Sequence, residues 1–101
     1  MKASEILERH RPDIIKIVKK YEAKGFHNPR VFGSVARGDD TDESDIDLMV
    51  DIKSGFRPSL LTLIAMNNDL EELLGVKVDL ITARSIPEDT REKVFKEAIA
   101  L

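Results

Sequence analysis

Apolar and polar positions recur along the chain with two different periods, and together they predict both helices and strands. Apolar residues follow the helical period from Ala3 to Lys24, with one inward stripe at Ile14, Ile15, Val18 and Tyr21. Ser4 is the expected N-cap, and Gly25 is the expected stop. Pro12 is expected either to start a second helix or to kink one long helix.

Two further segments carry helical patterns in the second half of the chain. Ser59 caps a predicted helix that ends at Gly75, with apolar positions Leu60, Leu63, Ile64, Leu70, Leu73 and Leu74. The sequence from Ser85 to Glu88 resembles a capping box and predicts a last helix reaching about Ala100. Its expected inward residues are Val94, Phe95, Ala98 and Ile99.

Three short runs are typical of strands. Residues Arg30 to Phe32 follow a predicted turn at 26–29, Asp45 to Ile52 alternate, and Val76 to Thr82 alternate again. The expected element order is helix, strand, strand, helix, strand, helix. This order predicts an α/β chain of the α+β kind, with a sheet and helices in one domain spanning residues 1–101.

Composition narrows the class of protein. A chain of 101 residues has room for one small domain but not for a second, substrate-binding one. The 42% hydrophobic content is enough for one core. A net charge of -3 argues against a protein that coats nucleic acid, so a nucleic-acid partner is not expected. The absence of cysteine excludes a disulfide, a thiolate zinc site and a thiol nucleophile. That absence fits a reducing cytoplasm, which is the expected location, and no apolar run is long enough to span a membrane.

Aspartates interrupt two of the predicted strands. In the run that begins at Asp45, alternation sends Ile46, Leu48 and Val50 toward the core and places Asp45 and Asp47 together on the other side. Asp79 interrupts the third strand in the same way. An exposed sheet face is the ordinary explanation, but aspartate is a poor strand former, and such violations are expected at functional sites. Carboxylates held side by side favour a hard cation such as Mg²⁺.

Zinc is not expected, because the histidines show no ligand spacing. His10 lies in a predicted helix and His27 in a predicted turn, so both are interpreted as surface residues.

A second chemical element is Gly33-Ser34, directly after the apolar pair Val31-Phe32. Glycine lets backbone amides approach a ligand, and the serine hydroxyl suits phosphate oxygens. An ordinary turn explains Gly-Ser by itself. Together with three carboxylates, however, it indicates a site in which metal ions hold a nucleoside triphosphate and align an attacking hydroxyl.

These segments resemble a known family. Gly33 to Gly38, Ser44 to Leu48 and Val78 to Leu80 are similar to the signature of the minimal nucleotidyltransferases (MNT), the smallest members of the DNA polymerase beta superfamily. The resemblance covers roughly residues 31–99. It implies the minimal nucleotidyltransferase fold, a small mixed sheet with helices packed on one face.

The resemblance also implies roles for individual residues. Asp45, Asp47 and Asp79 would be the catalytic carboxylates and the ligands of two Mg²⁺ ions. Gly33, Ser34 and Arg37 would bind the nucleotide, with ATP as the substrate. None of these motif positions is substituted, so the resemblance implies an active nucleotidyltransferase.

Members of this family are often antitoxins of HEPN-type helical toxins, and some transfer AMP to a tyrosine of that partner. The resemblance therefore implies an adenylyltransferase acting on a HEPN-type protein. Two alternatives stay open: a binding module that neutralises its partner by occlusion, and a transferase acting on a small molecule. The sequence leaves open the nucleotide preference, the acceptor residue and whether the chain forms a homo-oligomer.

Overall fold

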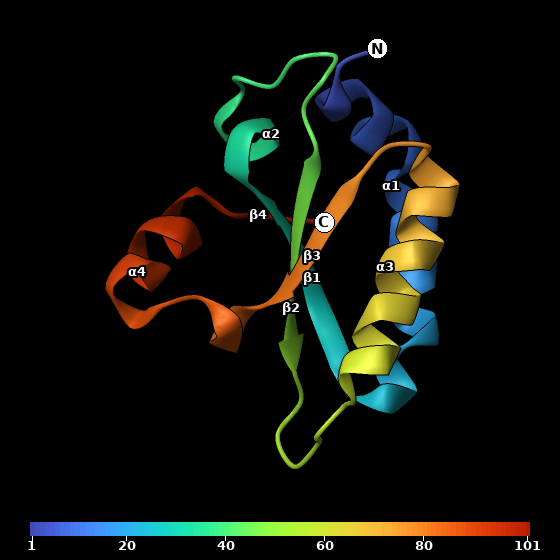
Figure 1. Ribbon diagram of the computed structural model, residues 1–101, viewed down its shortest axis with the longest axis vertical. Coiled ribbons are helices and arrows are strands. Elements are labelled where there is room, and N and C mark those ends of the chain that lie inside the picture. The colour runs from blue at the N-terminus through green and yellow to red at the C-terminus, as the bar shows by residue number, and fades with distance from the viewer.

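The computed structural model describes residues 1–101 and contains a four-stranded sheet in the order β3-β2-β1-β4 (Figure 1). Strand β1 pairs antiparallel with β2 and β4, whereas β2 and β3 are parallel, so the predicted mixed sheet is confirmed. The strands are β1 (Phe26–Phe32), β2 (Ile46–Ile52), β3 (Val78–Thr82) and β4 (Ile99–Ala100). The helices are α1 (Ala3–Lys20), α2 (Gly33–Arg37), α3 (Leu60–Leu74) and α4 (Glu88–Glu97), with short 3-10 turns at Glu22–Lys24 and Ala83–Ser85.

The main core lies between the sheet and helices α1 and α3, which cover one face (Figure 1). Alternation along β2 and β3 sends every second residue into this core, as the sequence predicts. Its fully buried members include Ile14, Phe26, Ile46, Leu48, Val50, Met66 and Leu70. The expected packing of helices on one face is therefore confirmed for α1 and α3.

Helix α4 departs from that expectation, because it lies on the opposite side of the sheet (Figure 1). A smaller cluster of Met49, Ala83 and Ile86 forms there, with Phe32, Ile81, Val94 and Ala98 packed against it. The sheet is therefore apolar on both faces along part of its length, which a one-sided packing scheme does not accommodate. The aspartates of β2 and β3 share this second face with α4.

The first helix is continuous, and it begins earlier than predicted. Pro12 lies inside α1 and starts no second helix, and the N-cap is Lys2 instead of Ser4. The backbone N–H of Ser4 is satisfied instead by the Asp40 carboxylate, at 2.8 Å. Packing of Ile14 and Val18 into the core outweighs the single backbone hydrogen bond that proline removes.

Strand β1 includes the segment 26–29, which the sequence suggested was a turn. The pairing of β1 with β2 shifts register between His27 and Arg30, and Asn28 between them has φ +56°. This irregularity is a β-bulge, in which an extra residue interrupts the strand pattern without ending the strand. The turn prediction was wrong because Asn-Pro is an ordinary turn signal.

The end of the chain also differs from the prediction. The last helix stops at Glu97, and residues 99–100 form β4 at the edge of the sheet, so Ile99 is 48% exposed where burial was expected. Phe95, Leu60 and Ile64 are also exposed, at 45%, 69% and 45%. Apolar periodicity identifies one face of a helix but not whether another element covers it. None of the helices is long and apolar enough to cross a membrane.

Candidate nucleotide site

The aspartates of β2 and β3 lie side by side on the sheet. Asp47 and Asp79 are direct partners in the parallel register of these strands, so their side chains leave the same face. Asp47 is partly buried, while Asp79 and the preceding residue Asp45 are exposed. The structure therefore brings Asp47 and Asp79 together, and Asp45 lies directly before the first residue of β2.

Electrostatics single out Asp47. Burial raises the pKa of its carboxyl, and the charges of Asp79 and Asp45 raise it further, while Arg37 acts in the opposite direction. A carboxylate surrounded in this way is less stable in its charged form unless a cation lies nearby. The site is thus arranged at a cost in electrostatic energy, which is typical of functional clusters.

The donor set suits a hard divalent cation, although the side chains do not form a ready-made cage. No group of three or more His, Asp or Glu residues lies close enough together in the structure to hold a metal ion. Carboxylate oxygens are nevertheless the ligands that Mg²⁺ takes in phosphate-transfer sites, and a cation would relieve the repulsion around Asp47. The assignment of Asp45, Asp47 and Asp79 as metal ligands stays a prediction.

Gly33 approaches Asp47 more closely than any other residue type allows. It has φ +71°, and a Cβ atom placed on it would lie 2.1 Å from Oδ2 of Asp47. Gly33 directly follows Phe32, which is paired with Asp47 across β1 and β2. Glycine is required here for two reasons: the positive φ and the contact between its backbone and the carboxylate.

Helix α2 carries the remaining predicted nucleotide-binding residues. Ser34 is its second residue and is partly exposed, and Arg37 is its last, before Gly38 ends the helix with φ +81°. The Arg37 side chain is 48% exposed and pairs with Asp39 and Glu97 at 3.4 and 3.3 Å. These carboxylates, Asp39 first, raise the pKa of Arg37, so it is a permanent cation at the edge of the site.

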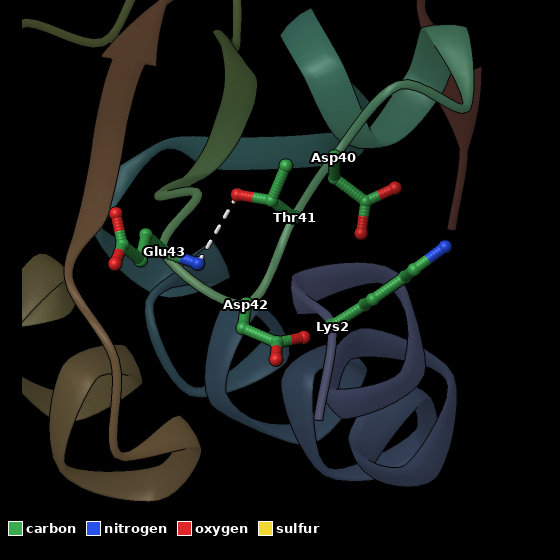
Figure 2. Close-up of a pocket in the computed structure, with 5 residues that line it drawn as sticks. All are labelled: Lys2, Asp40, Thr41, Asp42 and Glu43. Carbon is green, nitrogen blue, oxygen red and sulfur yellow. Dashed lines mark hydrogen bonds between the residues drawn. The ribbon is translucent and has the colours of Figure 1, made fainter.

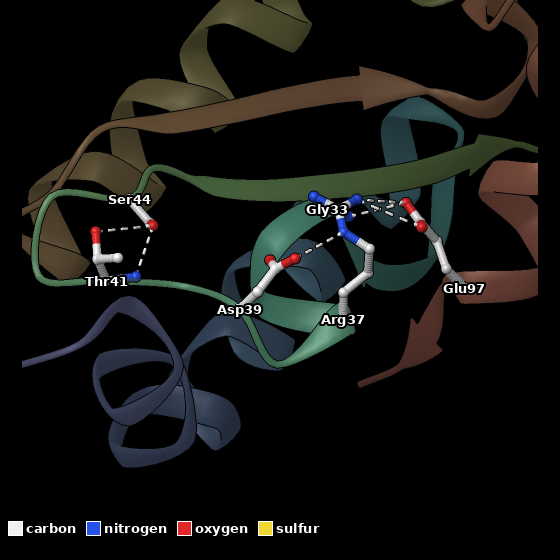
Figure 3. A network of polar contacts seen from close by, with 6 residues as sticks. All are labelled: Gly33, Arg37, Asp39, Thr41, Ser44 and Glu97. Carbon is white, nitrogen blue, oxygen red and sulfur yellow. Dashed lines mark hydrogen bonds and ion pairs between the residues drawn. The ribbon is translucent and has the colours of Figure 1, made fainter.

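Glu97 is a site residue that sequence reasoning missed. Its Oε1 accepts the backbone N–H of Gly33 at 3.4 Å, and both its oxygens accept from Nη1 of Arg37 at 3.3 and 3.4 Å (Figure 3). In the sequence it appears as one more charge on a polar helix, and it lies 64 residues after Gly33. No spacing rule could link it to α2, since the contact depends on where α4 packs.

An apolar pocket lies beside Asp79 on the side away from α2, between α3 and β3. It has a volume of about 250 Å³, and it is lined by Leu60, Leu63, Ile64, Asn67, Val78, Asp79 and Leu80. The strand edge beside it is closed, because Asn67 and Glu71 accept the N–H groups of Leu80 and Val78 at 3.1 and 2.9 Å. The predicted third carboxylate thus has an apolar surface next to it.

A larger hollow, of about 550 Å³, lies at the start of α1 and is lined by no hydrophobic residue (Figure 2). Its lining residues are Lys2, Asp40, Thr41, Asp42 and Glu43. Asp40 is buried, and its hydrogen bond from the Ser4 backbone is the main reason why its pKa is lowered. We interpret the hydrogen bond between Ser4 and Asp40 at this hollow as the contact that anchors the loop leading into β2.

Comparison with known proteins gives a consistent answer. The family described as "Nucleotidyltransferase domain" matches residues 2–101. A relative in Methanocaldococcus jannaschii, named as a candidate protein adenylyltransferase, is 43% identical over 94 residues, covering 92% of this chain and 87% of that protein. The protein adenylyltransferase MntA of Thermococcus cleftensis is 37% identical over 78 residues, covering 77% of each chain.

Solved structures agree with the sequence matches. The structure of a candidate minimal nucleotidyltransferase superposes with a TM-score of 0.77 at 39% identity, covering 94% of this chain and 95% of that chain. A mutant of the toxin-antitoxin MntA-HpeT has a TM-score of 0.73 at 25% identity, covering 90% of this chain and 70% of that chain. The predicted minimal nucleotidyltransferase fold is confirmed.

Proposed function

The chain belongs to the nucleotidyltransferase domain family, and we propose that it transfers AMP from ATP to a hydroxyl of a HEPN-type partner protein, acting as the antitoxin of that partner. One observation carries the proposal. Asp47 and Asp79 face the same side of the sheet in register, and Asp47 lies against the backbone of Gly33. The carboxylates that could bind metal ions and the glycine turn that could bind phosphate therefore lie next to each other, an arrangement that phosphate transfer requires.

Each candidate residue has a role in this proposal. Gly33, Ser34 and Arg37 hold the triphosphate, the first two through backbone N–H groups and the serine hydroxyl and Arg37 through its guanidinium. Asp45, Asp47 and Asp79 hold Mg²⁺, which when bound neutralises phosphate charge and polarises the oxygens in contact with it. Asp79, which is exposed beside β2, is also the group placed to take the proton of the attacking hydroxyl.

The reaction is a single displacement at the α-phosphorus of ATP. The acceptor oxygen forms a bond to that phosphorus as the bond to the bridging oxygen of pyrophosphate breaks, and the hydroxyl proton passes to a carboxylate or water. Attack in line requires the acceptor and the pyrophosphate to lie on opposite sides of the phosphorus. With the triphosphate at α2, the acceptor approaches from the β3 side.

The β3 side is where the apolar pocket beside Asp79 lies, and its features favour a protein acceptor. Leu60 and Ile64 on α3 are exposed there, next to a carboxylate in a chain of net charge -3. An acidic, partly apolar surface repels a nucleic-acid acceptor and suits a polypeptide hydroxyl flanked by apolar side chains. The relatives named as protein adenylyltransferases and the toxin-antitoxin neighbour support the same choice.

A protection assay separates catalysis from occlusion. We expect co-expression of the wild-type chain to relieve growth arrest by its HEPN-type toxin, and the triple change of Asp45, Asp47 and Asp79 to Asn to remove that relief. Both proteins are quantified by blotting, and a pull-down checks that the variant still binds the toxin. Full relief by the variant would overturn the catalytic proposal and establish occlusion.

A further inference from the structure

Glu97 is the last residue of α4, and it contacts both ends of α2. Its carboxylate accepts from the N–H of Gly33, the first residue of α2, and from the guanidinium of Arg37, the last (Figure 3). The Glu97 side chain is only 18% exposed, whereas Arg37 is 48% exposed. One acidic group from the C-terminal part of the chain therefore spans the whole predicted phosphate-binding helix.

This contact differs from an ordinary surface ion pair. The other ion pair of α4, between Lys96 and Glu92, joins neighbouring turns of one helix, and both side chains are at least 75% exposed. Such exposed pairs stabilise a protein little and orient nothing beyond their own two side chains. The Glu97 contacts join residues 60 and 64 positions apart and fix two donors at once.

The orientation of α2 matters because Gly33 also touches Asp47. A helix of five residues has few internal hydrogen bonds to hold it, so external contacts decide how it lies on the sheet. Loss of the Glu97 contacts would free both the Gly33 backbone and the Arg37 guanidinium. The two groups proposed to meet the triphosphate would then lose their common support.

We propose that Glu97 is a positioning residue of the nucleotide site, which holds the Gly33 amide and the Arg37 guanidinium so that α2 is ready to receive the triphosphate. This inference rests on the proposed function, because it assigns the residue a purpose in binding ATP. Glu97 does not touch the reacting atoms. Its effect is expected in the affinity for nucleotide and not in the chemical step.

The kinetic test compares Glu97→Ala and Glu97→Gln with Glu92→Ala, which makes the same charge change as Glu97→Ala, at an exposed position of the same helix. Glu97→Ala should raise KM for ATP about tenfold while kcat changes less than about twofold, the scale expected for charge-assisted hydrogen bonds. Glu97→Gln should raise KM less, because its amide oxygen still accepts from Gly33. Glu92→Ala should match the wild type.

Two outcomes for Glu97→Ala would overturn the inference. An unchanged KM would show that the contacts do not affect nucleotide binding, and a lower KM would show that Glu97 competes with phosphate.

A nucleotide-free measurement keeps this inference separable from the proposed function. Hydrogen exchange of the Gly33 amide, followed by NMR, should be faster in Glu97→Ala than in the wild type and in Glu92→Ala. Equal exchange in all three would overturn the positioning role, whatever the kinetics. Faster exchange in Glu97→Ala, in a protein that neither binds nor uses ATP, would support the contact and refute the proposed function instead.

Discussion

Asp47→Asn is expected to reduce AMP transfer by about 10²- to 10³-fold, the scale seen when one group that stabilises the transition state is removed. Asp47 is the carboxylate that lies against Gly33 and pairs in register with Asp79. Asparagine keeps its size but not its charge. Initial rates with wild type and variant, at saturating ATP and Mg²⁺, measure the effect.

The same variant should fold at least as well as the wild type. Burial and the neighbouring aspartates raise the pKa of Asp47, so the folded protein binds this proton more readily than the unfolded chain does. At neutral pH the charged Asp47 therefore destabilises the metal-free fold, and asparagine removes that cost. As the pH falls through the raised pKa, the wild type gains stability and the difference in Tm between the two proteins should shrink.

Asp51→Asn is the matched control, on the same strand and the same face. Burial would raise the pKa of Asp51, but hydrogen bonds from Asn28 and Arg30 outweigh burial and lower it, with Arg30 Nη2 at 2.6 Å. Its charged form is therefore stabilising above the unfolded pKa, and Asp51→Asn should lower Tm at neutral pH while transfer continues. Two results for Asp47→Asn would contradict these expectations: transfer at the wild-type rate, or a Tm at neutral pH below that of the wild type.

Gly33→Ala should damage both stability and transfer. The new Cβ would lie 2.1 Å from Oδ2 of Asp47, and φ +71° is unfavourable for alanine, so the carboxylate or the backbone must move. We expect unfolding free energy to fall by about 1–3 kcal/mol from backbone strain, with a further loss from the clash. Urea unfolding gives the first quantity, and transfer rates show whether Asp47 is displaced.

Gly38→Ala separates strain from contact. Gly38 has φ +81°, but nothing lies within 4 Å of a Cβ placed there. It should therefore lose stability through strain alone and keep its transfer activity. Equal losses of activity in the two variants would show that the close approach of Gly33 to Asp47 has no functional meaning.

Local signals in the sequence were sufficient for the elements that carry the aspartates. Helix α3 lies between Ser59 and Gly75 as predicted, because Ser59 accepts the Thr62 N–H and Gly75 adopts the left-handed conformation at the other end. Alternation in β2 and β3 correctly separates core residues from aspartates. The register places Asp47 beside Asp79, so two of the three predicted carboxylates are neighbours on the sheet.

Features that depend on distant contacts were not predictable from local pattern. Strand β4 is two residues long, and it is held by pairing with Arg30 and Val31 of β1 and by a hydrogen bond from Arg11 to the carbonyl oxygen of Ala100. The bulge at Asn28 interrupts the alternation that would have revealed the whole of β1. Glu97 acquires its contacts only because α4 packs on the second face of the sheet, a position that no periodicity encodes.

AMP transfer to a protein is measured by incubating this chain and the proposed HEPN-type partner with Mg²⁺ and ATP labelled on either the α- or the γ-phosphate. We predict that the partner acquires label from α-labelled ATP only, with pyrophosphate released, and that Asp47→Asn labels it far more slowly than the wild type does. Label from γ-labelled ATP would indicate a phosphotransferase. Tight binding to the partner with no label from either form of ATP would contradict the enzymatic account and leave occlusion as the mode of neutralisation.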